Sequence, residues 1–225
     1  MLCHALLSGA HSDDLVCALC RHRWRAVVPP WCERGGQPEP WFGACRICPD
    51  WPPALERVRS AVWLDPAARR AVHALKYGGL PRIAEDLAAV MARVHHVART
   101  PACLVPIPLG PRRLAMRGYN QSEWLARCLA RRWGIPVAHL LRRVRDTATQ
   151  TALTPAARLA NVAGAFAPVS RQRVEAGVLE RTVILVDDVF TTGATLAAAA
   201  RALGDVGARF VQAVTFGRAT IPDFT

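Results

Sequence analysis

The stretch VILVDDVFTTGATLAAAARAL, residues 183–203, limits the fold more than any other part of the chain. Its first four residues are apolar and β-favouring, which is typical of a strand buried on both faces of a sheet. Its alanine-rich second half is typical of a helix. Ligand sites in open α/β sheets lie beyond the carboxyl ends of such strands, and here that position holds the carboxylates Asp187 and Asp188. The stretch therefore predicts a ligand site between a strand and a helix.

The rest of the chain from Val58 onward alternates short apolar runs with helical patterns. The predicted strands are SAVWL (60–64), CLVPIPL (103–109), RTVILVDD (181–188) and RFVQAVTFG (209–217). The predicted helices are PAARRAVHALKY (66–77), AEDLAAVMARVHHVA (84–98), NQSEWLARCLARRWG (120–134) and GATLAAAARALGDVGA (193–208). Strands separated by helix-length segments indicate βαβ units, so an α/β fold with a mostly parallel sheet flanked by helices is expected.

The turn after the two carboxylates has the chemistry of a phosphate site. Gly193 lets the backbone approach an anion, and a helix N-terminus offers unpaired N–H groups with partial positive charge. Hydroxyls of Thr191, Thr192 and Thr195 add further donors. Two carboxylates would repel phosphate, so they are expected to face another group, and a sugar diol can donate hydrogen bonds to them.

Charge and hydropathy narrow the class of protein. The 225 residues carry a net charge of +12, and Lys76 is the only lysine among 29 basic residues. That arginine bias is more typical of coding preference than of function, although the positive field attracts phosphates and nucleic acid. No apolar run approaches the roughly 18 residues of a membrane span, and the N-terminus lacks the pattern of a secretory signal. No membrane insertion and a cytoplasmic location are therefore expected.

The first 48 residues hold six of the eight cysteines. Cys17-Ala-Leu-Cys20 and Cys45-Arg-Ile-Cys48 are two CxxC turns separated by 24 residues, a pattern that predicts a structural zinc site. An alternative stays open, because Cys3 and Cys32 lack partners: two incomplete sites, with three cysteines each, are also compatible with the sequence. The expected organisation is a cysteine-rich zinc-binding module over 1–55 and a second domain over 56–225.

The apolar strand followed by DDxxTTGxT resembles the motif with which type I phosphoribosyltransferases bind phosphoribosyl pyrophosphate (PRPP). The resemblance implies that Asp187 and Asp188 hold the ribose hydroxyls and form the catalytic pair. It implies that residues 191–195, Thr191, Thr192, Gly193, Ala194 and Thr195, surround the 5′-phosphate. It also implies a Mg²⁺ ion between the ribose hydroxyls and the pyrophosphate.

Three further segments resemble the ComF family of competence proteins. They are VPIPLGPRRLAMRGYNQSEWLA (105–126), RVRDTATQTALTPAARLANVAGAF (143–166) and HALKYGG (73–79). Together with the PRPP motif and the cysteine turns, they cover nearly the whole chain in the family's order. The resemblance implies a phosphoribosyltransferase-like domain with a small N-terminal zinc-ribbon-like module. It also implies a role in natural transformation, where incoming single-stranded DNA is handled in the cytoplasm. Competence helicases or recombination proteins are the partners it suggests.

The basic residues of these segments are candidate ligand contacts. Lys76 precedes Tyr77-Gly78-Gly79, a loop able to close over pyrophosphate. A second group is predicted to lie in the loop after a strand and to contact pyrophosphate or the DNA backbone: Arg112, Arg113, Arg117 and Tyr119. Four polar residues, Thr149, Gln150, Arg158 and Asn161, either line the same pocket or lie on the surface.

Three functions remain compatible with the sequence. The first is a PRPP-binding protein of DNA uptake that contacts single-stranded DNA. The second is a metabolic phosphoribosyltransferase that transfers ribose 5-phosphate to a small nucleophile, although TFGRATIPDF at the C-terminus carries no acceptor signature. The third is a non-catalytic adaptor that senses PRPP. Enzymatic activity is open, because the carboxylate pair indicates ligand binding without separating catalysis from sensing.

Overall fold

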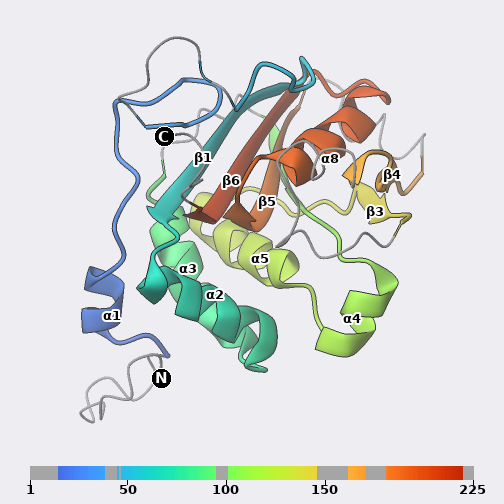
Figure 1. Ribbon diagram of the computed structural model, residues 1–225. Coiled ribbons are helices and arrows are strands. Elements are labelled where there is room, and N and C mark those ends of the chain that lie inside the picture. The colour runs from blue at the N-terminus through green and yellow to red at the C-terminus, as the bar shows by residue number, and fades with distance from the viewer. Residues whose placement is uncertain are drawn as a thin grey trace.

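The computed structural model describes residues 15–38, 45, 47–94, 101–145, 162–170 and 181–219. Its main sheet contains β1 (Leu55–Trp63), β6 (Phe210–Arg218), β5 (Thr182–Phe190) and β2 (Ala102–Pro106), in that spatial order. All three strand pairs are parallel, and helices lie on both faces of the sheet (Figure 1). The expected α/β fold, a parallel sheet flanked by helices, is confirmed.

The remaining elements surround this sheet. The helices are α1 (Ala18–His22), α2 (Pro66–Tyr77), the 3₁₀ turn η2 (Pro81–Ile83), α3 (Ala84–Met91), α4 (Pro111–Arg117), α5 (Gln121–Trp133) and α8 (Ala194–Gly204). Two short strands, β3 (Leu141–Arg143) and β4 (Phe166–Pro168), pair antiparallel apart from the main sheet.

Side-chain alternation along β5 divides the interior into two cores. Val183 and Leu185 belong to the core that α8 covers, whereas Ile184 and Val186 belong to the core that α2, α3 and α5 cover. All four side chains are at most 1% exposed. Burial on both faces is what the continuous apolar run predicted, and the alternation directs successive residues of β5 to opposite faces.

The candidate site lies where the connections of two neighbouring strands diverge. The chain leaves β2 toward α4 and α5 on one face of the sheet, and it leaves the neighbouring strand β5 toward α8 on the other face (Figure 1). Connections that diverge in this way from adjacent parallel strands leave a crevice at their carboxyl ends, which is the usual ligand position in such sheets. Asp187 and Asp188 lie near the end of β5.

Helix boundaries follow the local signals. Asp65 caps α2 by accepting hydrogen bonds from the backbone N–H of Ala67 and of Ala68, both at 2.9 Å, with Pro66 in the first turn. Asn120 caps α5 through the N–H of Ser122 at 3.1 Å. Gly134 ends α5 in the left-handed conformation, which glycine adopts without steric cost.

Two segments differ from the sequence-based expectation. The segment of Arg112, Arg113 and Arg117 was expected as a loop and instead forms the helix α4. Pro111 in its first turn and Gly118 at its left-handed C-cap are standard helix boundaries, and they enclose residues of high helix propensity. The helix predicted over 84–98 ends at Met91, and residues 95–98 lie outside the described part of the chain.

The described residues before β1 (15–38, 45 and 47–54), which we call the cysteine-rich segment, pack on both faces of the sheet. Near its start, Trp24 meets Phe216 edge-on, with ring centroids 4.9 Å apart, and Arg21 of α1 pairs with Asp86 of α3 at 2.7 Å. Near its end, Cys48 and Trp51 belong to the core that α8 covers. This segment therefore supports the sheet directly.

None of the described helices is both long and apolar enough to cross a membrane.

The cap of α2 is testable through stability. Replacing Asp65 by Ala leaves two backbone N–H groups without their acceptor, so the free energy of unfolding should fall by about 1 kcal/mol. Urea denaturation measures the difference. Exposed Asp50 is the matched control, and Asp50→Ala should change stability by less than about 0.5 kcal/mol. Equal effects of the two substitutions would contradict the capping role.

Candidate functional site

Asp188 is a buried carboxylate, only 3% exposed, near the end of β5. Its position in the strand directs it toward α2 and α5, and both helices supply a partner. Lys76, in the last turn of α2, forms an ion pair with Oδ2. Gln121, the first residue of α5, donates from Nε2 to Oδ1 at 3.1 Å. A buried carboxylate needs such partners, because an uncompensated charge in the interior is strongly destabilising.

Asp187 is less buried and is held differently. Its Oδ1 accepts hydrogen bonds from the Ser122 hydroxyl at 2.9 Å and from the backbone N–H of Asp188 at 2.9 Å. Asp187 is partly exposed whereas Asp188 is buried, so Asp187 is the more accessible of the two acids to a ligand at the end of β5. The two acids thus differ in accessibility, and Asp187 is the better placed for contact.

The same environment gives the two acids opposite pKa shifts. Burial, and then the negative charge of Asp188, raises the pKa of Asp187 to about 7. Burial also acts to raise the pKa of Asp188, but the charge and hydrogen bond of Lys76 outweigh it and keep this pKa below its usual value. Adjacent acids that cannot both ionise freely separate their pKa values in this way. Asp188 is therefore anionic at neutral pH, whereas Asp187 titrates there.

Residues 191–195, which we call the phosphate loop, run from the end of β5 into the first turn of α8. Gly193 has φ of +79° at the N-terminus of α8, and a Cβ there would lie 2.6 Å from Cζ2 of Trp51 and 2.9 Å from Phe190. Only glycine suits this position, because the backbone is left-handed and rests against an indole. Residues 189–191 and 193–196 line a shallow pocket at the start of α8. Backbone N–H groups at such a helix start can bind a phosphate.

The predicted basic contacts divide into two groups. Lys76 lies beside the carboxylate pair, and Arg117 is joined to it through a hydrogen bond to Oε1 of Gln121. The Arg117 guanidinium also lies 5.1 Å from the ring centroid of Tyr77. Tyr119 donates its hydroxyl to the carbonyl of Leu75, so it joins the turn after α4 to α2. Arg112 is exposed on α4.

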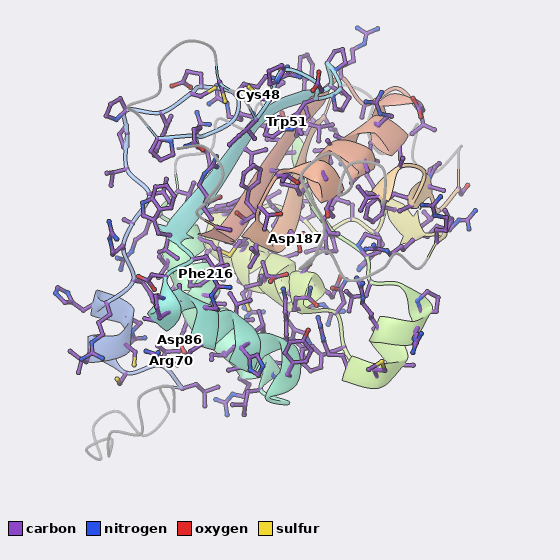
Figure 2. All side chains as sticks on the ribbon, in the orientation of Figure 1. Cys48, Trp51, Arg70, Asp86, Asp187 and Phe216 are labelled. Carbon is purple, nitrogen blue, oxygen red and sulfur yellow. The ribbon has the colours of Figure 1, made fainter. Side chains whose placement is uncertain are left out.

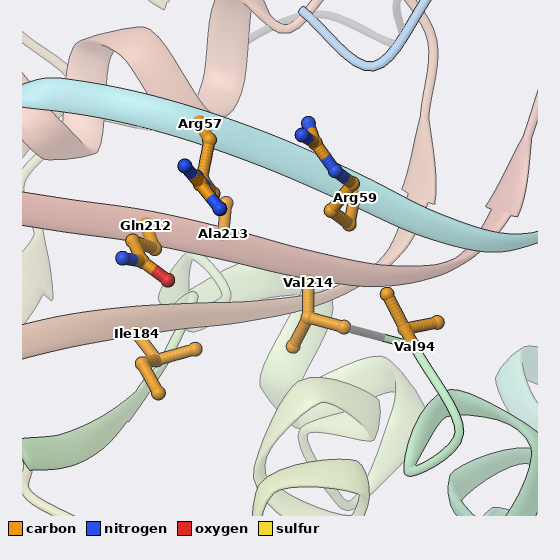
Figure 3. A pocket seen from close by; sticks show the side chains of 7 residues that line it. All are labelled: Arg57, Arg59, Val94, Ile184, Gln212, Ala213 and Val214. Atoms are coloured by element: carbon orange, nitrogen blue, oxygen red, sulfur yellow. The ribbon is translucent and has the colours of Figure 1, made fainter. Parts of the chain in front are cut away.

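A second pocket lies over the sheet, away from the carboxylate pair. It is lined by residues from β1, β5 and β6 and by Val94, shown in Figure 3. Its β6 residues, 212–214, precede Thr215, which pairs with Asp187. This pocket therefore belongs to the middle of the strands and not to their carboxyl ends. The candidate residues Thr149, Gln150, Arg158 and Asn161 lie outside the described residues.

The described cysteines before β1 separate into two groups. Cys32, Cys45 and Cys48, which we call the cysteine cluster, have Sγ atoms within 4.8 Å of one another. Cys17 and Cys20 lie at α1, and Cys20 packs in the core on the α2, α3 and α5 side. The structure thus does not bring the first CxxC turn to the second, because α1 and Cys48 lie at separate ends of the molecule (Figures 1 and 2). Cys3 lies outside the described residues.

The geometry of the cysteine cluster suits a thiophilic ion. The Sγ atoms of Cys32 and Cys48 are 3.8 Å apart, and two thiolates at about 2.3 Å from a tetrahedral Zn²⁺ ion are also about 3.8 Å apart. Burial acts to raise the pKa of Cys32, but the backbone N–H groups of Gly35 and Arg34 outweigh it and lower this pKa. Burial, and then Cys45, raises the pKa of Cys48 to about 12. A cation would favour three thiolates that otherwise repel one another.

Four residues of the site carry roles that the motifs did not predict. Gln121 and Ser122 hold the carboxylate pair, whereas Trp51 and Arg218 support the phosphate loop. For Gln121 and Ser122 the sequence did contain a signal, because both were predicted to lie at the start of a helix that follows a strand. The roles of Trp51 and Arg218 depend on long-range packing, for which local patterns carry no signal.

A family model described as "Phosphoribosyl transferase domain" matches residues 119–220. This range includes the carboxylate pair, the phosphate loop and the start of α5.

Three curated relatives extend the similarity. "DNA utilization protein YhgH" of Salmonella typhimurium is 34% identical over 219 residues, covering 94% of this chain and 92% of the relative. "Competence protein F" of Haemophilus influenzae is 36% identical over 135 residues, covering 59% of this chain and 57% of the relative. "Competence protein ComFC" of Bacillus subtilis is 29% identical over 205 residues, covering 87% and 80%.

The raised pKa of Asp187 predicts a pH dependence of stability. A carboxyl whose pKa is higher in the folded state than in the unfolded state binds its proton more tightly when folded. Its contribution to stability is present at low pH and is lost as pH rises through about 7. Wild-type protein should therefore lose stability relative to Asp187→Asn between about pH 4, the usual carboxyl value, and pH 7.

Denaturant unfolding of both proteins at several pH values measures this difference. If the free energies of unfolding of the two proteins change in parallel across that interval, the pKa of Asp187 is not raised and the prediction is wrong.

Proposed function

Because the chain belongs to the ComF family and carries a phosphoribosyltransferase domain, we propose that it binds PRPP between the carboxylate pair and the phosphate loop, and that it serves the handling of single-stranded DNA during natural transformation. The observation that carries the proposal is the arrangement at the end of β5. A partly exposed acid, Asp187 of β5, lies six residues before Gly193, a left-handed glycine at a helix N-terminus.

Each part of PRPP has a matching chemical group in this arrangement. The phosphate loop offers N–H groups and threonine hydroxyls to the 5′-phosphate. Asp187 accepts hydrogen bonds from the ribose diol, and Asp188 supplies the negative charge behind it. The carboxylates do not oppose the phosphate, since the ribose separates the two.

The pyrophosphate end lies toward Lys76 and Arg117 in this proposal. Both residues stand beside the carboxylate pair, through the ion pair to Asp188 and the hydrogen bond to Gln121. A Mg²⁺ ion fits the same place, since carboxylate and phosphate oxygens are its preferred ligands, and when bound it neutralises pyrophosphate. Displacement of pyrophosphate would develop positive charge on the ribose ring, which the carboxylates are placed to stabilise.

The DNA role rests on the relatives and on surface charge. Two relatives are named competence proteins and one is named a DNA utilization protein. None of the α4 residues is buried, and the helix exposes Arg112 together with Leu114 and Met116, which are 43% and 80% exposed. Guanidinium groups and apolar side chains on one exposed helix suit the backbone and bases of a single strand. We assign this helix to DNA.

Zinc completes the proposal as a structural ion. We assign it to Cys32, Cys45 and Cys48, whose sulfur spacing fits it. The cysteine-rich module is retained with a proposed boundary near residue 55, at the start of β1.

Calorimetric titration with PRPP and Mg²⁺ tests the ligand. Asp187→Asn keeps the shape of the side chain and removes its charge, so PRPP affinity should fall at least about tenfold, which corresponds to about 1.4 kcal/mol. Exposed Asp205, at the far end of α8, is the matched control, and Asp205→Asn should leave the affinity unchanged. Unaltered affinity in Asp187→Asn would remove the ribose assignment.

The same titration with saturating single-stranded DNA separates two functions. A change in PRPP affinity when DNA is bound would support the competence role. Tight PRPP binding that is indifferent to DNA would favour a metabolic phosphoribosyltransferase instead.

The salt dependence of single-stranded DNA binding tests the proposed contact between α4 and DNA. Arg112→Ala should weaken binding of an oligothymidine strand and reduce the slope of log affinity against log salt by about 1, because one phosphate contact is lost. PRPP affinity should not change. Arg201 is an exposed residue of α8, and Arg201→Ala is the control. Equal slopes in wild type and Arg112→Ala would place the DNA elsewhere.

A further inference from the structure

The cysteine cluster lacks a fourth thiolate at the position where a complete zinc turn would have one. Cys32 begins a turn in which the residue three positions later is Gly35. Gly35 donates its backbone N–H to the Cys32 sulfur at 3.2 Å. A Cβ at this glycine would lie 3.1 Å from the Cys45 sulfur and 3.6 Å from the Cys48 sulfur. The turn therefore lies beside the sulfurs of Cys45 and Cys48, but position 35 has no side chain that could bind an ion.

The turn that begins at Cys32 is connected to the phosphate loop through Arg218. This side chain is 1% exposed. Its guanidinium donates to the Gly35 carbonyl at 3.1 Å and to Oε1 of Gln37 at 3.0 Å. It also lies 4.4 Å from the ring centroid of Phe190, the last residue of β5. One cation therefore contacts both the Cys32 turn and the residue that precedes the phosphate loop.

Cys48 is connected to the phosphate loop through Trp51. The backbone N–H of Trp51 bonds the Cys48 carbonyl at 3.3 Å. Its indole, 5% exposed, meets Phe190 edge-on at 6.1 Å and lies against the position of Gly193. Figure 2 shows Cys48 and Trp51 next to each other. The left-handed Gly193 at the start of α8 thus lies against Trp51, which is three residues after Cys48.

Arg34 joins the Cys32 turn to the backbone from Cys48 onward. Its guanidinium donates to four backbone carbonyls, those of Cys48, Trp51, Pro52 and Leu55, at 3.0 to 3.1 Å. The backbone carbonyl of Arg34 accepts from the N–H of Val58 in β1 at 2.9 Å. Any ion that fixes the Cys32 turn against Cys45 and Cys48 therefore also fixes the backbone that positions the indole.

We propose that Cys32, Cys45 and Cys48 form a three-thiolate site for one thiophilic cation, Zn²⁺, and that its occupancy is coupled to binding of a phosphate ester at the phosphate loop. The proposal rests on the proposed function, since it takes the loop as the phosphate site. The bound ion holds Trp51 and Arg218 where they support Gly193 and Phe190. Each ligand consequently raises the affinity for the other by the same factor.

Two reciprocal titrations test the coupling, with ribose 5-phosphate as a probe that carries the phosphate ester without pyrophosphate. Calorimetry compares its affinity for zinc-loaded and metal-free protein. Competition with a chromophoric chelator compares zinc affinity with and without ribose 5-phosphate. Both ratios should be at least about fivefold and should agree. Zinc stoichiometry should be one per chain at the cluster, and Cys48→Ser should lose that ion.

Trp51→Phe provides the uncoupled variant. The shorter ring keeps an apolar contact but withdraws from Gly193, so zinc should still bind while ribose 5-phosphate no longer alters zinc affinity. Trp133→Phe is the matched control, because Trp133 lies at the end of α5 and bonds the Ala92 carbonyl. It loses a comparable indole and should retain the full coupling.

The outcomes separate the two proposals. If zinc-loaded wild type does not bind ribose 5-phosphate at all, the phosphate site itself is wrong. If it binds with the same affinity with and without zinc, only the coupling is overturned. Full coupling in Trp51→Phe would also overturn the proposed route. If metal-free protein unfolds, detected by circular dichroism, zinc competition on Trp51→Phe and on Trp133→Phe still decides the question.

Discussion

The burial of a charged Asp188 at the carboxyl end of β5 is the constraint on which the site depends. A carboxylate that is 3% exposed requires compensation, and it receives it from α2 through Lys76 and from α5 through Gln121. These contacts fix two helices against the strand end and leave Asp187 as the accessible acid. The same charge raises the pKa of Asp187. Position, accessibility and protonation of the pair thus follow from one buried group.

On the other face of the sheet, the phosphate loop depends on the cysteine-rich segment. Gly193 adopts its conformation against Trp51, and Phe190 lies between Trp51 and Arg218. The segment is therefore more than an appendage of the parallel sheet. Its residue Trp51 lies against both Gly193 and Phe190, so packing from this segment contributes to the environment of the loop.

The sequence predicted what local rules determine. Continuous apolar residues indicated β5, Pro66 indicated the start of α2, and Gly134 indicated the end of α5, because strand burial and helix caps are encoded within a few residues. The helix α4 was missed because its short, basic sequence resembles a loop and buries no side chain. The ion pair of Lys76 with Asp188 and the support of Gly193 by Trp51 join distant residues, so only the fold brings them together. The cluster of Cys32 with Cys45 and Cys48 was one of two alternatives that CxxC spacing left open.

A crystal structure of the protein with PRPP and Mg²⁺ tests the central claim most directly. The account predicts the 5′-phosphate on the backbone N–H groups of residues 191–195 and the ribose diol within hydrogen-bond distance of Asp187. It further predicts pyrophosphate on the side of Lys76 and Arg117. A phosphate bound at any other place, with the loop after β5 empty, would contradict the account.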